Sequence, residues 1–210
     1  SNLSSWTYTI TLKNNVMASF LEELAWALSW ENIRQKMSFI KEDMLWKSVF
    51  SPNLNLVSNP ERKNSCYNRK FDWEWFSTEK LELVSNWILK NIFLDYKNAL
   101  KFNLKPTGNP SFSNLEVTWD LSSDYLKNSS FLFTKLMAFH NIDSSTGKFA
   151  LEWEWFEIKS WKIDKFVKNV SITWSVLDLF WNIENIGNDV YSNSNIFTPS
   201  VTFKNQHIVI

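Results

Sequence analysis

Glycine is nearly absent from this sequence, and tryptophan occupies positions where tight turns favour glycine. The 210 residues include 3 glycines and 13 tryptophans, whereas average glycine usage of about 7% predicts roughly 15. Asn86-Trp87 and Ser160-Trp161 each separate two runs of alternating apolar and polar residues. A two-residue hairpin turn of type I′ needs positive φ at both central positions and therefore favours Asn-Gly. A tryptophan in that left-handed conformation costs about 1–2 kcal/mol, so any fold built on these hairpins is strained as written.

We interpret most or all of these tryptophans as glycines in the natural protein. A UGA codon that some bacteria translate as glycine becomes tryptophan when it is decoded with another genetic code. The many Asn, Lys, Ile and Phe residues, with only three Arg, suit the AT-rich genome that such recoding accompanies. Trp26 and Trp30 agree with this interpretation, because they lie at the end of a helical run, where glycine is common. The alternative is a tryptophan-rich binding protein whose indole rings stack on sugars or bases.

Composition and charge exclude several classes of protein. Lys plus Arg and Asp plus Glu both number 22, so no basic surface for nucleic acid is predicted. Cys66 is the single cysteine, which excludes a disulfide framework. No apolar run reaches the ~18 residues of a membrane span, and no signal peptide is recognisable. We therefore expect a soluble, cytoplasmic protein with no membrane partner, and we take the start at Ser1 as the sign of a fragment.

The hydrophobic pattern predicts an α+β fold that is dominated by strands. A helix is expected over 16–29, because apolar residues recur there every three or four positions, with Asn14 or Asn15 as its N-cap. The other expected elements are a short helix at 31–39, strands at 6–12, 49–50, 54–57, 115–118 and 131–136, a hairpin at Asn86, a helical turn at 96–100, an antiparallel meander over 148–170, a helix at 176–186, and strands at 201–203 and 208–210. The prediction is one domain, 1–210, with a mostly antiparallel sheet, one main N-terminal helix and a short C-terminal helix.

Motifs of known chemistry are scarce. No phosphate-binding loop, dinucleotide fingerprint or nucleophile elbow is present, and replacing Trp by Gly creates none. The two histidines, far apart and without metal-ligand spacing, are His140 and His207. Asp72 with Glu74, and Glu152 with Glu154, alternate with tryptophans and could support two-carboxylate hydrolysis. Alternation would instead place each pair on one solvated strand face, which is the simpler explanation.

Five short segments resemble the C-terminal domain of the TldD/PmbA family when tryptophan is replaced by glycine. They are Phe71–Thr78 (like F-D-D-E-G-x-P-T), Asn86–Lys90 (N-G-V-L-K), Leu104–Asn109 (L-K-P-T-G-N), Thr146–Phe149 (T-G-x-F) and Ile186–Asp189 (I-G-N-D). Each alone is weak, but all five occur in the family's order with intact spacing, over essentially the whole chain. The resemblance is therefore specific, and it implies that domain's fold without the family's N-terminal domain.

The resemblance implies a metalloprotease family in which one type of subunit binds zinc and the other does not. The catalytic type carries H-E-x-x-x-H on a helix, with two histidines about one turn apart and Glu as general base, and a cysteine after I-G-N-D. Here Leu21 and Trp26 stand at the histidine positions, and only Glu22 fits. The loop 190–197 has no cysteine, and Cys66 lies far upstream. The chain thus resembles the PmbA (TldE) type, with no catalytic residue, metal ligand or cofactor of its own and with zinc expected in its catalytic partner.

The implied function is that of a non-catalytic subunit in a TldD-type metalloprotease complex that degrades or processes unfolded peptides. The expected partners are a TldD-like catalytic subunit, in a hetero-oligomer, and an unfolded peptide held as an added strand at a sheet edge. Two alternatives stay open. One is a peptidase or hydrolase in its own right that uses Asp72, Glu74 or Glu22, and the other is a Trp-rich module that binds carbohydrate or nucleic acid.

The candidate residues for substrate or partner contact lie within the family-like motifs. They are Asp72, Glu74, Thr107, Gly108, Asn109, Asn188 and Asp189. Turn and cap chemistry is the competing explanation, because Asn and Asp side chains readily satisfy nearby backbone groups.

Overall fold

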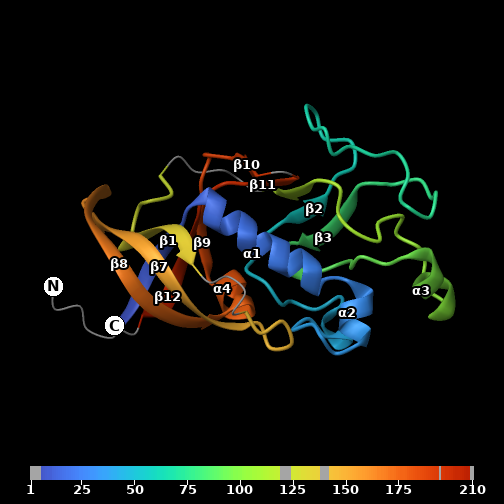
Figure 1. Cartoon of the computed structure of the whole chain (residues 1–210), viewed down its shortest axis with the longest axis horizontal. Helices are drawn as coiled ribbons and strands as arrows, with labels where there is room; N and C mark the ends of the chain where they lie inside the picture. Colours follow the sequence, from blue (N-terminus) through green and yellow to red (C-terminus); the bar gives the residue numbers. More distant parts are fainter. Residues whose placement is uncertain (1–5, 119–123, 138–141, 194, 209–210) are drawn as a thin grey trace.

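A long helix, α1 (Asn14–Ala27), packs against two six-stranded sheets in the computed structural model, which describes residues 6–118, 124–137, 142–193 and 195–208 (Figure 1). The first sheet has the order β8 (Lys162–Ser175), β7 (Lys148–Lys159), β6 (Phe131–Met137), β1 (Trp6–Leu12), β12 (Val201–Ile208) and β9 (Ile183–Ile186). The second has the order β10 (Tyr191–Asn193), β11 (Ile196–Thr198), β5 (Leu115–Val117), β2 (Leu56–Ser58), β3 (Leu81–Ser85) and β4 (Ile88–Leu89).

Short helices complete the fold. They are α2 (Trp30–Arg34), the 3-10 turn η1 (Glu42–Met44), α3 (Tyr96–Lys101) and α4 (Val176–Trp181). Among the described strands, parallel pairing is confined to β1 with β6 and β5 with β11. The predicted α+β class, with a mostly antiparallel arrangement and one main N-terminal helix, is therefore confirmed. No helix in the described ranges is long and apolar enough to cross a membrane.

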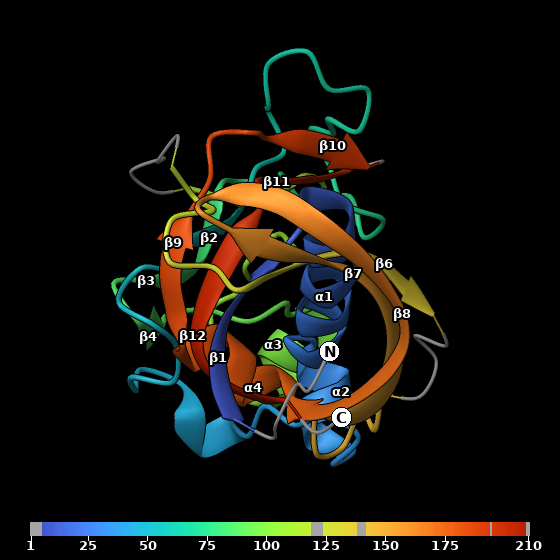
Figure 2. The ribbon, with the colours of Figure 1, turned by 90° about the vertical axis from the view of Figure 1, so that its left-hand side faces the viewer.

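The first sheet curves around α1, as Figure 2 shows. The helix buries Val16, Met17, Phe20, Leu21 and Leu24, whose spacing of three and four residues places them on one broad face. Bulges in the pairing of β6 with β7 and of β7 with β8 increase the local twist and help the sheet to bend. The apolar pattern that predicted the helix thus also places it at the centre of the core.

The predicted N-cap of this helix is wrong. Lys13 is the N-cap, and its side chain makes no capping bond. Asn14 and Asn15 lie in the first turn, and their amides donate to the backbone carbonyls of Asp189 (2.8 Å) and Thr134 (3.0 Å). These asparagines therefore tie the helix to distant segments, and a propensity argument based on local sequence could not anticipate those bonds.

The helix predicted at 176–186 is half helix and half strand. Only α4 is helical, and β9 follows it directly. Ile186 pairs with Val201 of β12, and both Ile183 and Ile186 are buried. Pairing with β12 satisfies the backbone hydrogen-bonding groups of residues 183–186. The helix therefore ends at Trp181.

Other boundaries also differ from the prediction. The helix expected at 31–39 is the shorter α2, and α1 ends at Ala27 because Ser29 is extended as the N-cap of α2 (φ −72°, ψ 127°). Val49 and Phe50 form no strand; their N–H groups donate to the carbonyl of Trp87 (3.1 and 3.4 Å). The meander consists of two long strands, β7 and β8, and β12 is one strand where two were expected, while residues 209–210 lie outside the described ranges.

The two predicted hairpin turns are confirmed. Asn86 and Trp87 join β3 to β4 with φ of 47° and 61°, and Ser160 and Trp161 join β7 to β8 with φ of 49° and 64°. Trp26, by contrast, lies inside α1 and Trp30 begins α2, and neither has positive φ. The helix-end explanation for that pair is therefore wrong.

Candidate functional site

A cleft runs along the exposed face of α1, where the family resemblance places a metal site. Its volume is about 300 Å³. The residues that line it are Glu22, Ala25, Trp26, Ser29, Asn32, Phe93, Pro110, Ser111 and Phe112. Spacing of three, four and seven residues brings the members on α1 and at its end onto one side of the helix. We call this hollow the α1 cleft.

Only one of the two predicted histidine positions faces the α1 cleft. Trp26 lines it with 37% of its surface exposed, whereas Leu21 is fully buried in the core. Residues five apart on an α-helix are rotated by roughly 140° relative to each other, so positions 21 and 26 point in different directions. The expectation that these positions lie one turn apart on a shared face is wrong for this helix, and Glu22 is the residue that shares a face with Trp26.

The side chains on α1 do not fit a zinc ion. Leucine has no lone pair, and indole N–H is a donor only, which leaves the single carboxylate of Glu22. In the described ranges, no group of three or more His, Cys, Asp or Glu side chains could hold a metal. The neighbouring Glu23 is half-buried, and its pKa is raised by that burial and, secondarily, by the charge of Glu22.

Asp72 and Glu74 lie in a tight loop and not on a strand, so the predicted strand face is wrong for this pair. Oδ1 of the buried Asp72 accepts from the N–H groups of Glu74 (2.8 Å) and Phe76 (2.9 Å). Glu74 Oε2 accepts from the N–H of Tyr96 (2.7 Å) at the start of α3, where a carboxylate is favoured by the unpaired backbone donors. Each carboxylate is thus engaged by backbone groups, as the turn-and-cap explanation expects.

Residues Thr107, Gly108 and Asn109 pack directly against that loop. A Cβ on Gly108 would lie 2.4 Å from the carbonyl oxygen of Ser77, and the backbone has φ +62°. The amide of the fully buried Asn109 donates to the carbonyl of Glu79 (2.9 Å). The segment 107–109 and the loop 71–78 therefore form one structural unit.

The same unit borders two hollows. Thr107 and Gly108 line a second cleft of about 390 Å³ together with Phe76, Glu79 and Lys105. The next residues along the chain, Pro110–Phe112, line the α1 cleft. Arg69 links the two sides, because its guanidinium donates to the carbonyl (2.8 Å) and hydroxyl (3.1 Å) of Ser111. Burial lowers the pKa of Arg69, and the nearby charge of Asp72 opposes that effect.

Asn188 and Asp189 lie apart from the other candidates, at the opposite end of α1. Asp189 accepts from the backbone N–H of Ser200 (2.8 Å), from its hydroxyl (2.6 Å) and from the amide of Asn14 (3.2 Å). Burial raises the pKa of Tyr125, and the charge of Asp189 raises it further. Asn188 is exposed. Asp189 therefore fastens β12 to the first turn of α1, which is a structural role.

Of the remaining sequence candidates, those whose side chains the structure describes do not line the α1 cleft. Cys66 is exposed in a loop. Glu154 lies in β7 with its carboxylate 3.6 Å from the Lys135 ammonium. His140 lies outside the described residues, and for His207 and Glu152 only the backbone is described.

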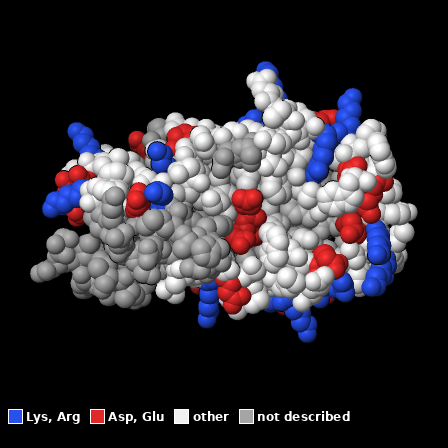
Figure 3. Space-filling model, viewed as in Figure 1, with Lys and Arg blue, Asp and Glu red and all other residues white. Residues whose placement is uncertain are grey.

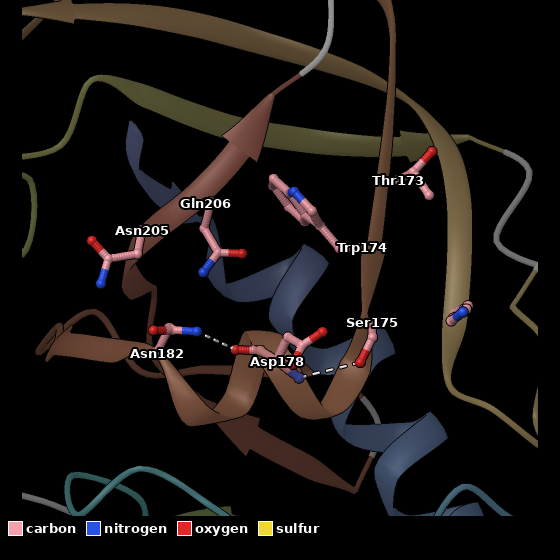
Figure 4. A pocket seen from close by; sticks show the side chains of 8 residues that line it. Thr173, Trp174, Ser175, Asp178, Asn182, Asn205 and Gln206 are labelled. Atoms are coloured by element: carbon pink, nitrogen blue, oxygen red, sulfur yellow. Dashed lines mark hydrogen bonds between the residues drawn. The ribbon is translucent and has the colours of Figure 1, made fainter. Parts of the chain in front are cut away.

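The largest of these hollows is lined by polar side chains at the end of the curved sheet (Figure 4). It has a volume of about 470 Å³, and Trp174 of β8 and Gln206 of β12 point into it. Ser175 caps α4 by accepting from the N–H of Asp178 (3.3 Å), and the Asn182 amide donates to the Asp178 carbonyl (2.8 Å). Because these polar groups serve α4 itself, the α1 cleft is the stronger functional candidate.

On the molecular face that Figure 3 displays, basic and acidic side chains are interspersed toward both ends, whereas an acidic group at the centre has no basic neighbour in that view. Sequence reasoning missed the outer wall of the α1 cleft, Phe93 and Pro110–Phe112. The adjacency of Pro110 to the L-K-P-T-G-N-like motif was the one available signal, whereas Phe93 is brought in only by the fold.

The chain is similar to known proteins in both sequence and fold. A profile of the PmbA/TldA metallopeptidase C-terminal domain matches residues 5–209. A metalloprotease PmbA homolog of Buchnera aphidicola is 28% identical over 200 residues, which cover 91% of this chain and 44% of that protein. The chain spans less than half the length of the curated relatives it matches.

Two solved structures share the fold. A Thermotoga maritima protein, described as a candidate modulator of a DNA gyrase, covers 100% of this chain and 51% of its own, with a TM-score of 0.91 and 23% identity. TldE from Thermococcus kodakarensis covers 99% of this chain and 51% of its own, with a TM-score of 0.83 and 16% identity. At these identities the two structures establish the fold alone.

Proposed function

The chain belongs to the PmbA/TldA metallopeptidase C-terminal domain family, and from this premise we propose that it is part of a non-catalytic, PmbA/TldE-like subunit of a TldD-type metalloprotease complex. The complex degrades or processes unfolded peptides, and its zinc is bound by the TldD-like partner. Because the chain spans less than half the length of its curated relatives, activity, substrate and partner are proposed for the whole protein. We expect that protein in the cytoplasm.

The donor set on α1 carries the proposal. Leu21 is buried in the core and Trp26 supplies no lone pair, so of the three motif positions on this helix only Glu22 offers a ligand atom. Catalytic zinc sites have three protein ligands and an open position, and one carboxylate cannot replace them. Peptide hydrolysis by the complex therefore depends on a partner that retains the histidines.

The α1 cleft supports the substrate part of the proposal. Phe93 and Phe112 supply apolar surface that does not depend on the identity of residue 26, and Ser29 and Asn32 supply polar groups. A volume of about 300 Å³ suits side chains of an extended peptide and not a folded domain. Such a peptide gains affinity by adding to a sheet edge while its alternate side chains enter pockets.

The edge that we propose for the peptide is β10. It is the outermost strand of the second sheet, and it packs against α1. It follows Asp189, which contacts the first turn of α1, so a peptide on this edge would have to run along the helix to reach the α1 cleft at its other end. At the other edge of that sheet, β4 is bridged by Ser48, and the Trp46 N–H donates to the carbonyl of Leu89 (2.7 Å). In the first sheet, the edge strand β9 already accepts a hydrogen bond at the carbonyl of Glu184, donated by the Asn53 side chain (3.2 Å).

Co-purification with the catalytic partner tests the subunit role. The full-length protein would be co-expressed with the H-E-x-x-x-H protein of the same genome, and each would also be purified alone. We expect a stable complex that cleaves an unfolded peptide, an inactive isolated subunit, and loss of cleavage but not of association after chelation. Absence of association would refute the proposal, and cleavage by the isolated subunit after exhaustive chelation would favour a hydrolase in its own right.

A further inference from the structure

Four tryptophans have a backbone conformation that suits glycine. Trp46, Trp75, Trp87 and Trp161 have φ of 64°, 64°, 61° and 64°. Within the described residues, the other non-glycine positions with positive φ are five asparagines, Lys36 and Ser160. Asparagine tolerates the left-handed region, but a bulky aromatic residue there is an outlier. Tryptophan, the largest side chain, therefore occupies four positions whose backbone conformation favours glycine.

The backbone itself imposes these conformations. Asn86-Trp87 lies between the paired residues Ser85 and Ile88, and Ser160-Trp161 lies between paired Lys159 and Lys162. Each is a two-residue hairpin with positive φ at both positions, the type I′ turn for which Asn-Gly is preferred. Pairing of the flanking strands requires this turn whatever side chain the second residue carries.

The other two positions are also fixed by backbone hydrogen bonds. Around Trp75, the carboxylate of Asp72 accepts from the residues on either side, Glu74 and Phe76. Trp46 donates its own N–H to the carbonyl of Leu89 (2.7 Å). In both places the backbone has positive φ, and the indole takes no part in these hydrogen bonds.

Packing does not offset the strain. The four side chains are 43% to 83% exposed, so little apolar surface leaves water. The Trp161 ring has a neighbour in the Lys127 ammonium, 5.8 Å from the ring centre, which is at the limit of a cation–π contact. A natural sequence gains almost nothing from tryptophan at these positions.

Two buried tryptophans are also unusual, because of their side chains and not because of their backbone. The indole N–H groups of Trp30 and Trp155 are buried and have no hydrogen-bond partner in the described structure. Buried indole N–H groups usually find one. The Trp155 ring packs closely on Phe131 and Phe133 (centroids 4.3 and 5.4 Å apart), so Trp155 is not among the positions that we infer to be glycine.

We infer that residues 46, 75, 87 and 161 are glycines in the polypeptide that the cell makes, encoded by UGA and decoded here as tryptophan. One codon assignment accounts for all four strained positions together with the scarcity of glycine. The inference does not depend on the proposed subunit role, because it rests on backbone geometry, side-chain exposure and composition. It also adds Trp46, which the sequence pattern did not single out.

The codons of the native gene and the mass of the native protein test this inference directly. Trypsin would release peptides 42–47, 71–80 and 81–90, which contain positions 46, 75 and 87. We expect UGA at all four positions and glycine in the three peptides isolated from native cells by tandem mass spectrometry. UGG codons, or peptides that carry tryptophan at these positions, would overturn the inference.

A stability comparison separates the backbone effect from simple removal of an indole. W87G and W87A, and W161G and W161A, would be melted beside W26G and W26A, because Trp26 is an exposed position inside α1. Glycine should raise Tm above alanine by about 2–4 °C at positions 87 and 161, and it should lower Tm relative to alanine at position 26. Higher melting of both alanine variants at 87 and 161 would contradict the geometric argument.

Discussion

Substituting Gly108 by alanine should destabilise the protein by about 2–5 kcal/mol. Gly108 has φ +62°, and a residue with a Cβ in that region costs about 1–2 kcal/mol. The new Cβ would also lie 2.4 Å from the carbonyl oxygen of Ser77. That atom belongs to the backbone and cannot rotate away, so the loop 71–78 must move. Overpacking of this kind costs about 1–3 kcal/mol more.

Gly147 provides the matched control. It has nearly the same backbone conformation, with φ +71°, but an added Cβ would lie 3.1 Å from the ring of Phe39. A side chain can yield by a few tenths of an ångström, so G147A should cost about 1–2 kcal/mol. Urea unfolding of both variants, followed by circular dichroism, gives the difference that isolates the contact with Ser77. If G108A is no more destabilising than G147A, the close packing of these two loops is refuted.

D189A should lower the free energy of unfolding by about 2–4 kcal/mol, because buried donors on Ser200 lose their acceptor; N188A, at the exposed neighbour, should change it by less than about 0.5 kcal/mol. Equal effects in chemical denaturation would contradict the structural role of Asp189. E23Q should make stability less dependent on pH. The pKa of Glu23 is raised above 4.5 by burial and by Glu22, so the native protein loses stability as pH rises from about 4.5 through the higher folded-state pKa. Stability measured from pH 4 to pH 7 should therefore fall more for the parent than for E23Q, and parallel curves would refute this assignment.

Local sequence predicted those elements whose structure local forces determine. The apolar spacing of 16–28 fixes a helix, and Asn86-Trp87 fixes a hairpin, because both signals lie within a few residues of each other. Segment 183–186 was misassigned because Ile183 and Ile186 continue the three- and four-residue spacing of α4. Its pairing with β12, about fifteen residues away along the chain, decides the outcome, and periodicity contains no information about that partner.

In the candidate site, too, local sequence predicted the local hydrogen bonds but not the contacts between distant segments. Motif composition suggested turn chemistry, because short polar side chains bond to nearby backbone; Asp72 does accept from its own loop, whereas the Asn109 amide also donates to Glu79, thirty residues away in sequence. It could not show that loop 71–78 meets segment 107–109, since only the backbone contact of Gly108 with Ser77 reveals this. It also could not separate Asp189 from the other candidates, because the length of α1 sets that distance.

The absence of metal ligands from α1 is built into the packing of the core. A histidine at position 26 would face the α1 cleft beside Glu22, but a histidine at position 21 would enter the space that Leu21 fills at full burial. An imidazole there would leave a polar group unpaired among apolar side chains, at a cost of about 1–3 kcal/mol. Two substitutions therefore would not rebuild a zinc site on this helix, because position 21 faces the core while position 26 faces the α1 cleft.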